Sequence, residues 1–184
     1  MKILNPVDFV NNFIGKDEYN GVLRPERFVV HIQLPGLMKG KINEDVLIFN
    51  IESFQCPNLQ MELAEIEINS IKHAYYKKRN DSNFSITFYE SSEYYFRKFF
   101  YEWINLGFDM KKGIRKYIDD IISPRVEIAP IGMNDSINNA DVFEKVYPIS
   151  INDLDYDYSK TGEILKTKVE FTYVYHTIEP SQLK

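Results

Sequence analysis

The longest regular pattern in this sequence is a two-residue alternation close to its C-terminal end. Apolar, β-branched or aromatic side chains occupy every second position of one stretch: Leu165, Thr167, Val169, Phe171, Tyr173 and Tyr175. Successive side chains of a strand point to opposite faces of a sheet, so this spacing is typical of a half-buried strand and does not fit a helix. A shorter alternation of Leu154, Tyr156 and Tyr158 precedes it, with a turn signal at 159–162 between the two. Together they predict a long β-hairpin.

Composition extends the preference for strands to the whole chain. The sequence holds 22 Ile and 11 Val but only four Ala, together with 13 Phe and 13 Tyr. β-Branched and aromatic side chains fit the pleated, half-buried surface of a sheet. At 184 residues the chain suits one ordinary domain. We therefore predict a mainly β fold, an antiparallel β-sandwich or barrel, with residues 23–184 as a single domain after a short N-terminal helix or arm over residues 1–22.

One segment has the spacing of an amphipathic helix. We predict this helix from Glu93 to Leu106, with Ser91 and Ser92 as N-terminal capping residues and Gly107 as its end. Large aromatic side chains recur along one face at helical spacing: Phe96, Phe99, Phe100 and Trp103. We expect these four residues to anchor a single outer helix to the sheet.

Shorter patterns predict the remaining elements. Strands are expected at 27–33, 46–51, 84–88 and 125–130, a second short helix at 111–122, and an exposed loop at 71–82.

The segment that begins at Leu59 changes phase in its middle. Leu59, Met61 and Leu63 alternate with polar residues, but Ile66 and Ile68 follow the opposite phase. One extra residue in a strand, a β-bulge, produces such a slip and bends the sheet. We therefore predict a bulge at 63–64.

Charge and hydropathy exclude several classes of protein. The chain has 22 basic and 27 acidic residues and a net charge of −5, which disfavours a protein that grips nucleic acid or anionic lipid through bulk electrostatics. No apolar run approaches the roughly 20 residues of a membrane-spanning helix, so no membrane association is expected. A single cysteine cannot form an intrachain disulfide.

The sequence offers little catalytic chemistry. It has no Gly-rich phosphate loop and no G-x-S-x-G motif, and its three histidines are isolated from one another. The row of Asp153, Asp155 and Asp157 is the best carboxylate cluster, and a solvated sheet face explains it better than a cation site or an acid/base pair. We expect no catalytic residues, no metal and no cofactor. A carboxylate-dependent hydrolase, or a β-sandwich module that binds carbohydrate or peptide through its tyrosines, stays open.

Four sequence blocks, taken in order, resemble the tail tube proteins of contractile-tailed bacteriophages. They are Leu23-Arg24-Pro25-Glu26-Arg27-Phe28-Val29-Val30; Phe54-Gln55-Cys56-Pro57-Asn58-Leu59; the run from Ser85 to Glu90 that leads into a Trp-bearing helix at 99–105; and 146–155 followed by 168–175. The resemblance covers most of the chain, from about Leu23 to Tyr175.

This resemblance implies a non-enzymatic structural subunit. It implies a homo-oligomer of stacked, hexameric rings whose lumen conducts genomic DNA at ejection without binding it specifically. The implied partners are the tail sheath protein and a baseplate tube-initiator, and the implied location is the virion tail, assembled in the cytoplasm of the host bacterium. A baseplate tube-initiator or a tube-terminator of the same fold is the alternative within this class.

Three sets of residues carry the expected contacts. The longest alternating strands should join the sheet that continues between subunits, through Leu154, Tyr156, Tyr158, Val169, Phe171 and Tyr173. Outward residues of the helix should meet the sheath: Arg97, Lys98, Glu102 and Asn105. Acidic residues of two strands should face the lumen and keep DNA from adhering: Glu62, Glu65, Glu67 and Glu127.

Overall fold

The computed structural model describes residues 23–109, 113–115, 117–132, 135–154, 156–159 and 161–183. The predicted arm over 1–22 lies outside these residues. The described chain is mainly antiparallel β-structure with few helices, as predicted. Its contacts group it into two units: residues 23–49, 117–146 and 173–183 form unit 1, and residues 50–116 and 147–172 form unit 2. The single domain over 23–184 stays a prediction.

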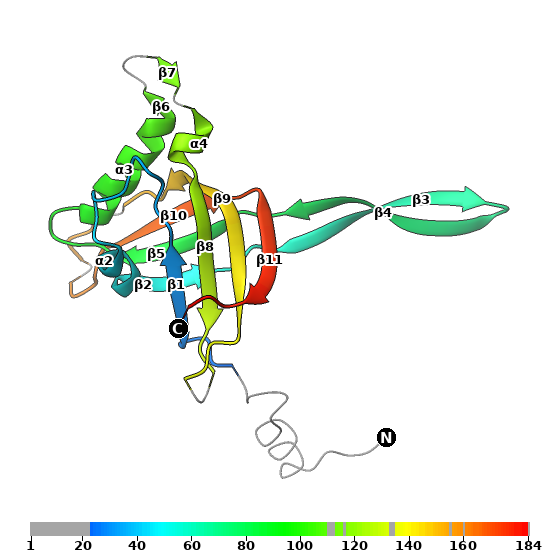
Figure 1. Cartoon of the computed structure of the whole chain (residues 1–184), viewed down its shortest axis with the longest axis horizontal. Coiled ribbons are helices and arrows are strands. Elements are labelled where there is room, and N and C mark those ends of the chain that lie inside the picture. The colour runs from blue at the N-terminus through cyan, green and yellow to red at the C-terminus, as the bar shows by residue number, and fades with distance from the viewer. Residues whose placement is uncertain are drawn as a thin grey trace, which may run out of the picture. The chain divides into compact units, whose positions relative to one another are not determined.

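Unit 1 contains an antiparallel sheet in the order β1, β8, β9, β11 (Figure 1). These strands are β1 (Phe28–Ile32), β8 (Ser123–Pro130), the first part of β9 (Asn139–Ile151) and β11 (Tyr175–Pro180). In register, Val30 lies opposite Ile128 and Glu127 lies opposite Val142. Val30 and Ile128 are buried on one face of the sheet, and Val142 and Glu127 are buried on the other, so both faces of this sheet are covered.

A short helix replaces one of the predicted strands. We predicted a strand at 46–51, but the chain forms α2 (Glu44–Phe49) and begins β2 (Ile51–Gln55) only after it. The Asn43 side chain accepts a hydrogen bond from the Asp45 amide at 3.0 Å, and Glu44 and Asp45 place acidic charge in the first turn. Both features stabilise a helix N-terminus, so local capping decided this segment. A second short helix, α4 (Ile118–Ile121), lies within the predicted range 111–122.

Unit 2 contains a second antiparallel sheet in the order β9, β10, β5, β2. The last residues of β9 pair with β10 (Lys166–Thr172), β10 pairs with β5 (Phe84–Tyr89), and β5 pairs with β2. The long helix α3 (Tyr95–Gly107) contacts β10, and the two-residue strands β6 (Phe108–Asp109) and β7 (Ile114–Arg115) follow it. Strand β10 is therefore central, with a partner strand on each side.

The aromatic face of α3 packs on this sheet. All four expected anchor residues are buried: Phe96, Phe99, Phe100 and Trp103. The Phe88 ring of β5 lies 5.5 Å from Phe96 and 5.1 Å from Phe100 between ring centroids. Phe171 of β10 contacts Phe100 and Trp103 from the other strand. The helical spacing of aromatic residues thus becomes one continuous ring cluster between helix and sheet.

The N-terminus of α3 is held by the predicted Ser91, whose Oγ accepts a hydrogen bond from the Tyr95 amide at 3.2 Å, and by a second side chain that sequence reasoning did not select. The helix begins at Tyr95, two residues later than predicted, after Tyr94 with a positive φ of 55°. The Glu90 carboxylate accepts hydrogen bonds from the backbone amides of Phe96 and Arg97 at 3.0 Å each. It also accepts one from the hydroxyl of buried Thr167 at 2.6 Å. Glu90 thus satisfies free amides of the first turn and ties β5, α3 and β10 together.

The structure corrects the predicted C-terminal hairpin. Leu154, Tyr156 and Tyr158 lie in a segment without strand structure, and β9 takes the place that they were given beside β10. The Asp157 carboxylate accepts a hydrogen bond from the Ser159 amide at 2.8 Å, which lowers the Asp157 pKa. Short acidic side chains that bond the backbone two residues ahead favour turns. The alternation at 154–158 therefore comes from acidic residues that favour a turn and are interleaved with apolar and aromatic residues.

The expected role of the second hairpin strand in a sheet between subunits stays a prediction, and the structure shows where its residues lie. Val169 and Phe171 are fully buried in β10, and both edges of β10 are already paired within the chain. Tyr173 falls between β10 and β11, where the chain passes from unit 2 to unit 1. A strand with both edges paired has no free backbone groups to offer a neighbouring subunit. A sheet that continues between subunits would therefore do so at the edges of other strands.

Candidate functional site

The most unusual feature of unit 2 is a long two-stranded ribbon. Strand β3 (Leu59–Ile68) follows β2, strand β4 (Ile71–Asp81) precedes β5, and the two pair along their whole length. At the base, the Ser82 amide donates to the Asn58 carbonyl at 3.1 Å, which connects this ladder to the β2/β5 pair. Figure 1 shows the ribbon leaving the sheet of unit 2 as an extension of those strands. We call residues 59–81 the β3–β4 ribbon.

The ribbon includes a segment that we predicted to be a loop. Residues 71–81 form β4, although their cluster of basic residues suggested an exposed turn. The turn is instead at Asn69 and Ser70, whose φ angles are 53° and 64°. Positive φ at two successive residues is the requirement of the tight type I′ hairpin turn, and Asn tolerates it better than most residues.

Both strands of the ribbon are open to solvent. All eleven residues of β4 are exposed, and no residue of β3 is buried. The exposed set includes many large apolar or aromatic side chains: Leu59, Met61, Leu63, Ile66, Ile68, Ile71, Tyr75 and Tyr76. Within the part of the chain that the structure describes, neither outer edge of the ribbon has a partner strand. An isolated two-stranded hairpin is marginally stable in water, so this ribbon is suited to be covered by a partner.

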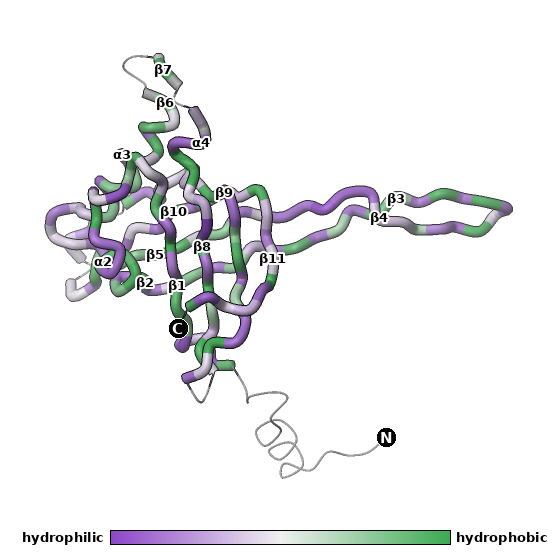
Figure 2. Tube along the Cα trace, in the orientation of Figure 1, coloured by the Kyte–Doolittle hydropathy of each residue, from purple (hydrophilic) through white to green (hydrophobic). Residues whose placement is uncertain are grey.

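The predicted phase slip is present, but the extra residue lies in the opposite strand. The pairing passes from Glu62 opposite Lys78 to Leu63 opposite Tyr76, so Lys77 is the bulged residue. Strand β3 itself alternates without interruption. Its apolar residues near the base and those near the tip therefore lie on opposite faces, and Figure 2 shows apolar and polar stretches succeeding one another along the ribbon.

Charge is divided between the two strands. β3 carries three glutamates and no Lys or Arg, whereas β4 carries three lysines and one arginine against a single aspartate. The formal charges are thus −3 and +3, and the ribbon as a whole is neutral. Lys77 Nζ lies 2.8 Å from Glu62 Oε1, and Lys72 Nζ lies 3.8 Å from Glu65 Oε2. Of the three β3 glutamates that we assigned to a lumen, Glu65 and Glu67 are exposed and Glu62 is half-buried, and basic residues of β4 accompany them.

Glu127, the fourth residue assigned to the lumen, is corrected by the structure. Its side chain is only 2% exposed and accepts hydrogen bonds from Ser181 Oγ at 2.7 Å and the Gln182 amide at 2.9 Å. Burial alone would raise the Glu127 pKa, but these bonds and nearby Arg125 outweigh it and lower the pKa. The carboxylate therefore fastens the C-terminal segment to β8 and is not a free surface charge.

The outer side of α3 is only partly as predicted. Arg97 is half-buried and donates from Nη1 to the Asn152 carbonyl at 2.8 Å, so its guanidinium holds the segment after β9 and does not point freely outward. Lys98 is exposed, whereas Glu102 and Asn105 are half-buried. Tyr101, which sequence reasoning passed over, is 62% exposed. The exposed part of this helix is thus centred on Lys98 and Tyr101.

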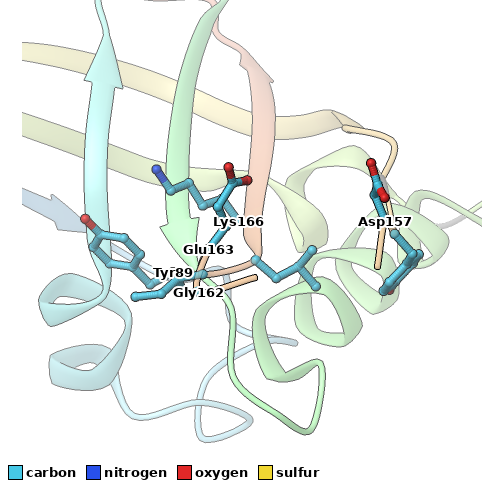
Figure 3. Close-up of a pocket in the computed structure, with 8 residues that line it drawn as sticks. Tyr89, Asp157, Gly162, Glu163 and Lys166 are labelled. Carbon is cyan, nitrogen blue, oxygen red and sulfur yellow. The ribbon is translucent and has the colours of Figure 1, made fainter. Parts of the chain in front are cut away.

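A groove lies beside the end of β10. Tyr89, Lys166 and residues of the preceding segment, including Asp157 and Glu163, line a volume of about 820 Å³ (Figure 3). Lys166 forms an ion pair with Glu52, whose hydrogen bond raises the Lys166 pKa, and its ammonium lies 5.8 Å from the centre of the Tyr89 ring. These contacts hold Lys166 in its charged form, which does not suit it to act as a base.

Neither a metal centre nor a membrane helix emerges from the described ranges. Within them, no group of three or more His, Cys, Asp or Glu side chains is placed to hold a metal ion. No described helix is long and apolar enough to cross a membrane.

The fold and its surfaces define a class: a mainly antiparallel β protein with one aromatic-anchored helix and a long exposed ribbon. The sequence of residues 23–179 matches the phage tail tube protein family, and the chain belongs to this family. The resemblance stated from the four sequence blocks is thereby confirmed. No curated protein matches the sequence significantly.

Solved structures support the fold at low sequence identity. A chain in the cryo-EM structure of the anti-feeding prophage tube-terminating cap is 13% identical with a TM-score of 0.60, over 87% of this chain and 92% of that one. A chain in the sheath/tube terminator structure of the PVC extracellular contractile injection system is 10% identical with a TM-score of 0.61, over 86% and 96%. A chain in the sheath-tube complex of the same system is 10% identical with a TM-score of 0.56, over 87% and 93%.

Proposed function

We propose that this protein is the non-enzymatic repeating subunit of a tail tube, and that its copies form hexameric rings which stack into a hollow tube. Membership of the phage tail tube protein family supports the tube role. The observation that carries self-assembly is the β3–β4 ribbon, which exposes eight large side chains and whose two outer edges have no partner strand among the described residues. A neighbouring copy would cover this surface. Ring stacking uses two different faces of one subunit, so the assembly grows into an open tube.

Passage of genomic DNA at ejection is the task we assign to the lumen. The chain has a net charge of −5, and because the ribbon is neutral this excess lies outside it. Six copies would carry about −30, enough to repel phosphates weakly along the wall. Such a lumen would let DNA slide and would not retain it.

The exposed side of α3 is our candidate contact for a tail sheath. Tyr101 offers an exposed aromatic ring with a hydroxyl, a side chain enriched in protein interfaces, and Lys98 adds a positive charge beside it. A baseplate initiator would contact the first ring only. We place the assembled protein in the virion tail, after assembly in the cytoplasm of the host bacterium.

A tube-terminator or tube-initiator of the same fold is the second candidate. The fold similarity extends to chains from the tube-terminating cap and the sheath/tube terminator structures, at TM-scores of 0.60 and 0.61. A terminator would also form a ring, but a single ring would not add further copies of itself. The two candidates therefore differ in stacking and agree in ring formation.

Negative-stain electron microscopy of the purified protein at rising concentration tests these roles. The repeating subunit should give rings that lengthen into tubes, whereas a terminator or initiator should stop at single rings. A protein that remains a monomer at every concentration would contradict both candidates and favour a binding module.

A further inference from the structure

We propose that β3 of one copy pairs with β4 of the next copy, so that the ribbons of a ring join edge to edge in one continuous antiparallel sheet. This inference rests on the proposed ring assembly and names the surface through which neighbouring copies in the ring contact each other. The partner that pairs with each open ribbon edge is a second copy of this chain.

Charge complementarity is the first argument. β3 has a formal charge of −3 and β4 has +3, and each strand is the outer edge of the ribbon on its own side. Two ribbons set side by side in the same direction bring the β3 edge of one against the β4 edge of the other. The acidic β3 of one copy therefore attracts the basic β4 of the next. Pairing β3 with β3, or β4 with β4, would bring like charges together.

Strand direction is the second argument. Within the ribbon, β3 and β4 are antiparallel. Rotational symmetry keeps the ribbons of a ring in equivalent orientations, so β4 of one copy also runs antiparallel to the adjoining β3. Each new pair can then use the same ladder that already exists within the chain, and every copy offers one edge and receives the other.

The register gives specific pairs. Within the chain, Glu62 lies opposite Lys78 and Glu67 lies opposite Lys72. If the same register is repeated between copies, Glu62 and Glu67 each have a lysine of their own β4 on one side and a lysine of the neighbouring β4 on the other.

The apolar residues give the third argument. The large exposed side chains of the ribbon sit on one face near the base and on the opposite face near the tip, for example Leu63 near the base and Ile68 near the tip. Joining ribbons edge to edge would align each set into a stripe that runs across all copies. Neighbouring side chains in such a stripe cover one another's flanks, which removes part of the apolar surface that a single ribbon leaves in water.

The test uses two charge-reversed variants and their mixture. One variant carries Glu62→Lys and Glu67→Lys, so both strands of its ribbon are basic. The other carries Lys72→Glu and Lys78→Glu, so both strands are acidic. Each variant alone should assemble about ten-fold less than the wild type, because every edge then meets an edge of like charge. An equal mixture should restore rings, because basic and acidic ribbons can alternate around them.

The mixture separates pairing between copies from pairing within a chain. If these charges acted only within their own ribbon, each variant would stay defective after mixing, and only the quadruple variant with all four reversals would recover. Size-exclusion chromatography with light scattering and negative-stain microscopy measure the assembled fraction. Circular dichroism and thermal unfolding check that the cores of both variants remain folded.

The outcomes distinguish this inference from the proposed function. Rings in the mixture, with few in either variant alone, support edge-to-edge pairing. Two outcomes would overturn the pairing and leave the tube role intact. Either each charge-reversed variant assembles normally on its own, or their mixture stays unassembled while the wild type forms rings. A wild type that never forms rings overturns both.

Discussion

Strands β4 and β5 are separated by only two residues, yet they lie in opposite environments. Every residue of β4 is exposed, whereas four of the six residues of β5 are buried. Both strands carry aromatic or β-branched side chains, so strand propensity does not separate them. The difference is what covers them: α3 and β10 lie on or beside β5, and among the described residues only β3 accompanies β4. The comparison teaches that burial follows from what packs against a strand: β5 is covered by other elements of the chain, and β4 offers the surface that our proposal assigns to a neighbouring copy.

The largest effect should follow from opening the aromatic cluster beside β5. Phe171→Ala should lower the free energy of unfolding by about 3–5 kcal/mol, because it removes a fully buried ring that contacts Phe84, Phe100 and Trp103. Chemical denaturation measures this change. Tyr101→Ala, an aromatic truncation on the exposed side of α3, is the matched control and should cost far less. Equal losses for both variants would contradict the central place of Phe171.

A smaller loss should follow from removing the acceptor at the start of α3. Glu90→Ala should lower the free energy of unfolding by about 2–3 kcal/mol, because the first turn of the helix loses two acceptors and the buried Thr167 hydroxyl loses one. Glu93→Ala, at an exposed residue just before the helix, is the control. Helix content from circular dichroism during unfolding reports whether α3 frays first. A stable Glu90→Ala variant with an intact helix would exclude the capping role.

Acid should weaken the attachment of the C-terminal segment in unit 1. The Glu127 pKa in the folded protein lies below its ordinary value of 4.5, so the carboxylate stabilises the fold above that pH and loses its contribution as the pH falls through the lower, folded pKa. Glu127→Gln should cost about 1–2 kcal/mol near neutral pH, and the gap from the wild type should shrink below about pH 5. Denaturation at a series of pH values measures it. A gap that does not change with pH would argue against an ionised Glu127.

The smallest effect on folding should come from the ribbon. Tyr76→Ser should change the free energy of unfolding by less than about 0.5 kcal/mol, because this side chain is 73% exposed and lies outside the buried clusters. The same substitution should reduce ring assembly, because it removes apolar surface that a neighbouring copy would cover. Denaturation and light scattering on one preparation give both results. A large loss of folding stability without loss of assembly would reverse the contrast between β4 and β5.

Sequence patterns could predict the parts of the fold that depend on local periodicity. The alternation around Val169 and the helical spacing of Phe96, Phe99 and Phe100 indicated a mainly β chain with one aromatic-faced helix, and the structure has both. Periodicity reports which side chains share a face, and this information is carried by neighbours in the chain.

Only the tertiary structure decided what each face or edge meets. The alternation at 154–158 looked like a strand, but β9 had become the partner of β10. Glu127 looked like a free surface charge until the C-terminal segment folded over it. The opposite charges of β3 and β4 became meaningful once pairing placed Glu62 beside Lys78. Strand pairing and burial bring together residues that are distant in the sequence. A local sequence pattern therefore does not indicate which strand or segment will be the partner.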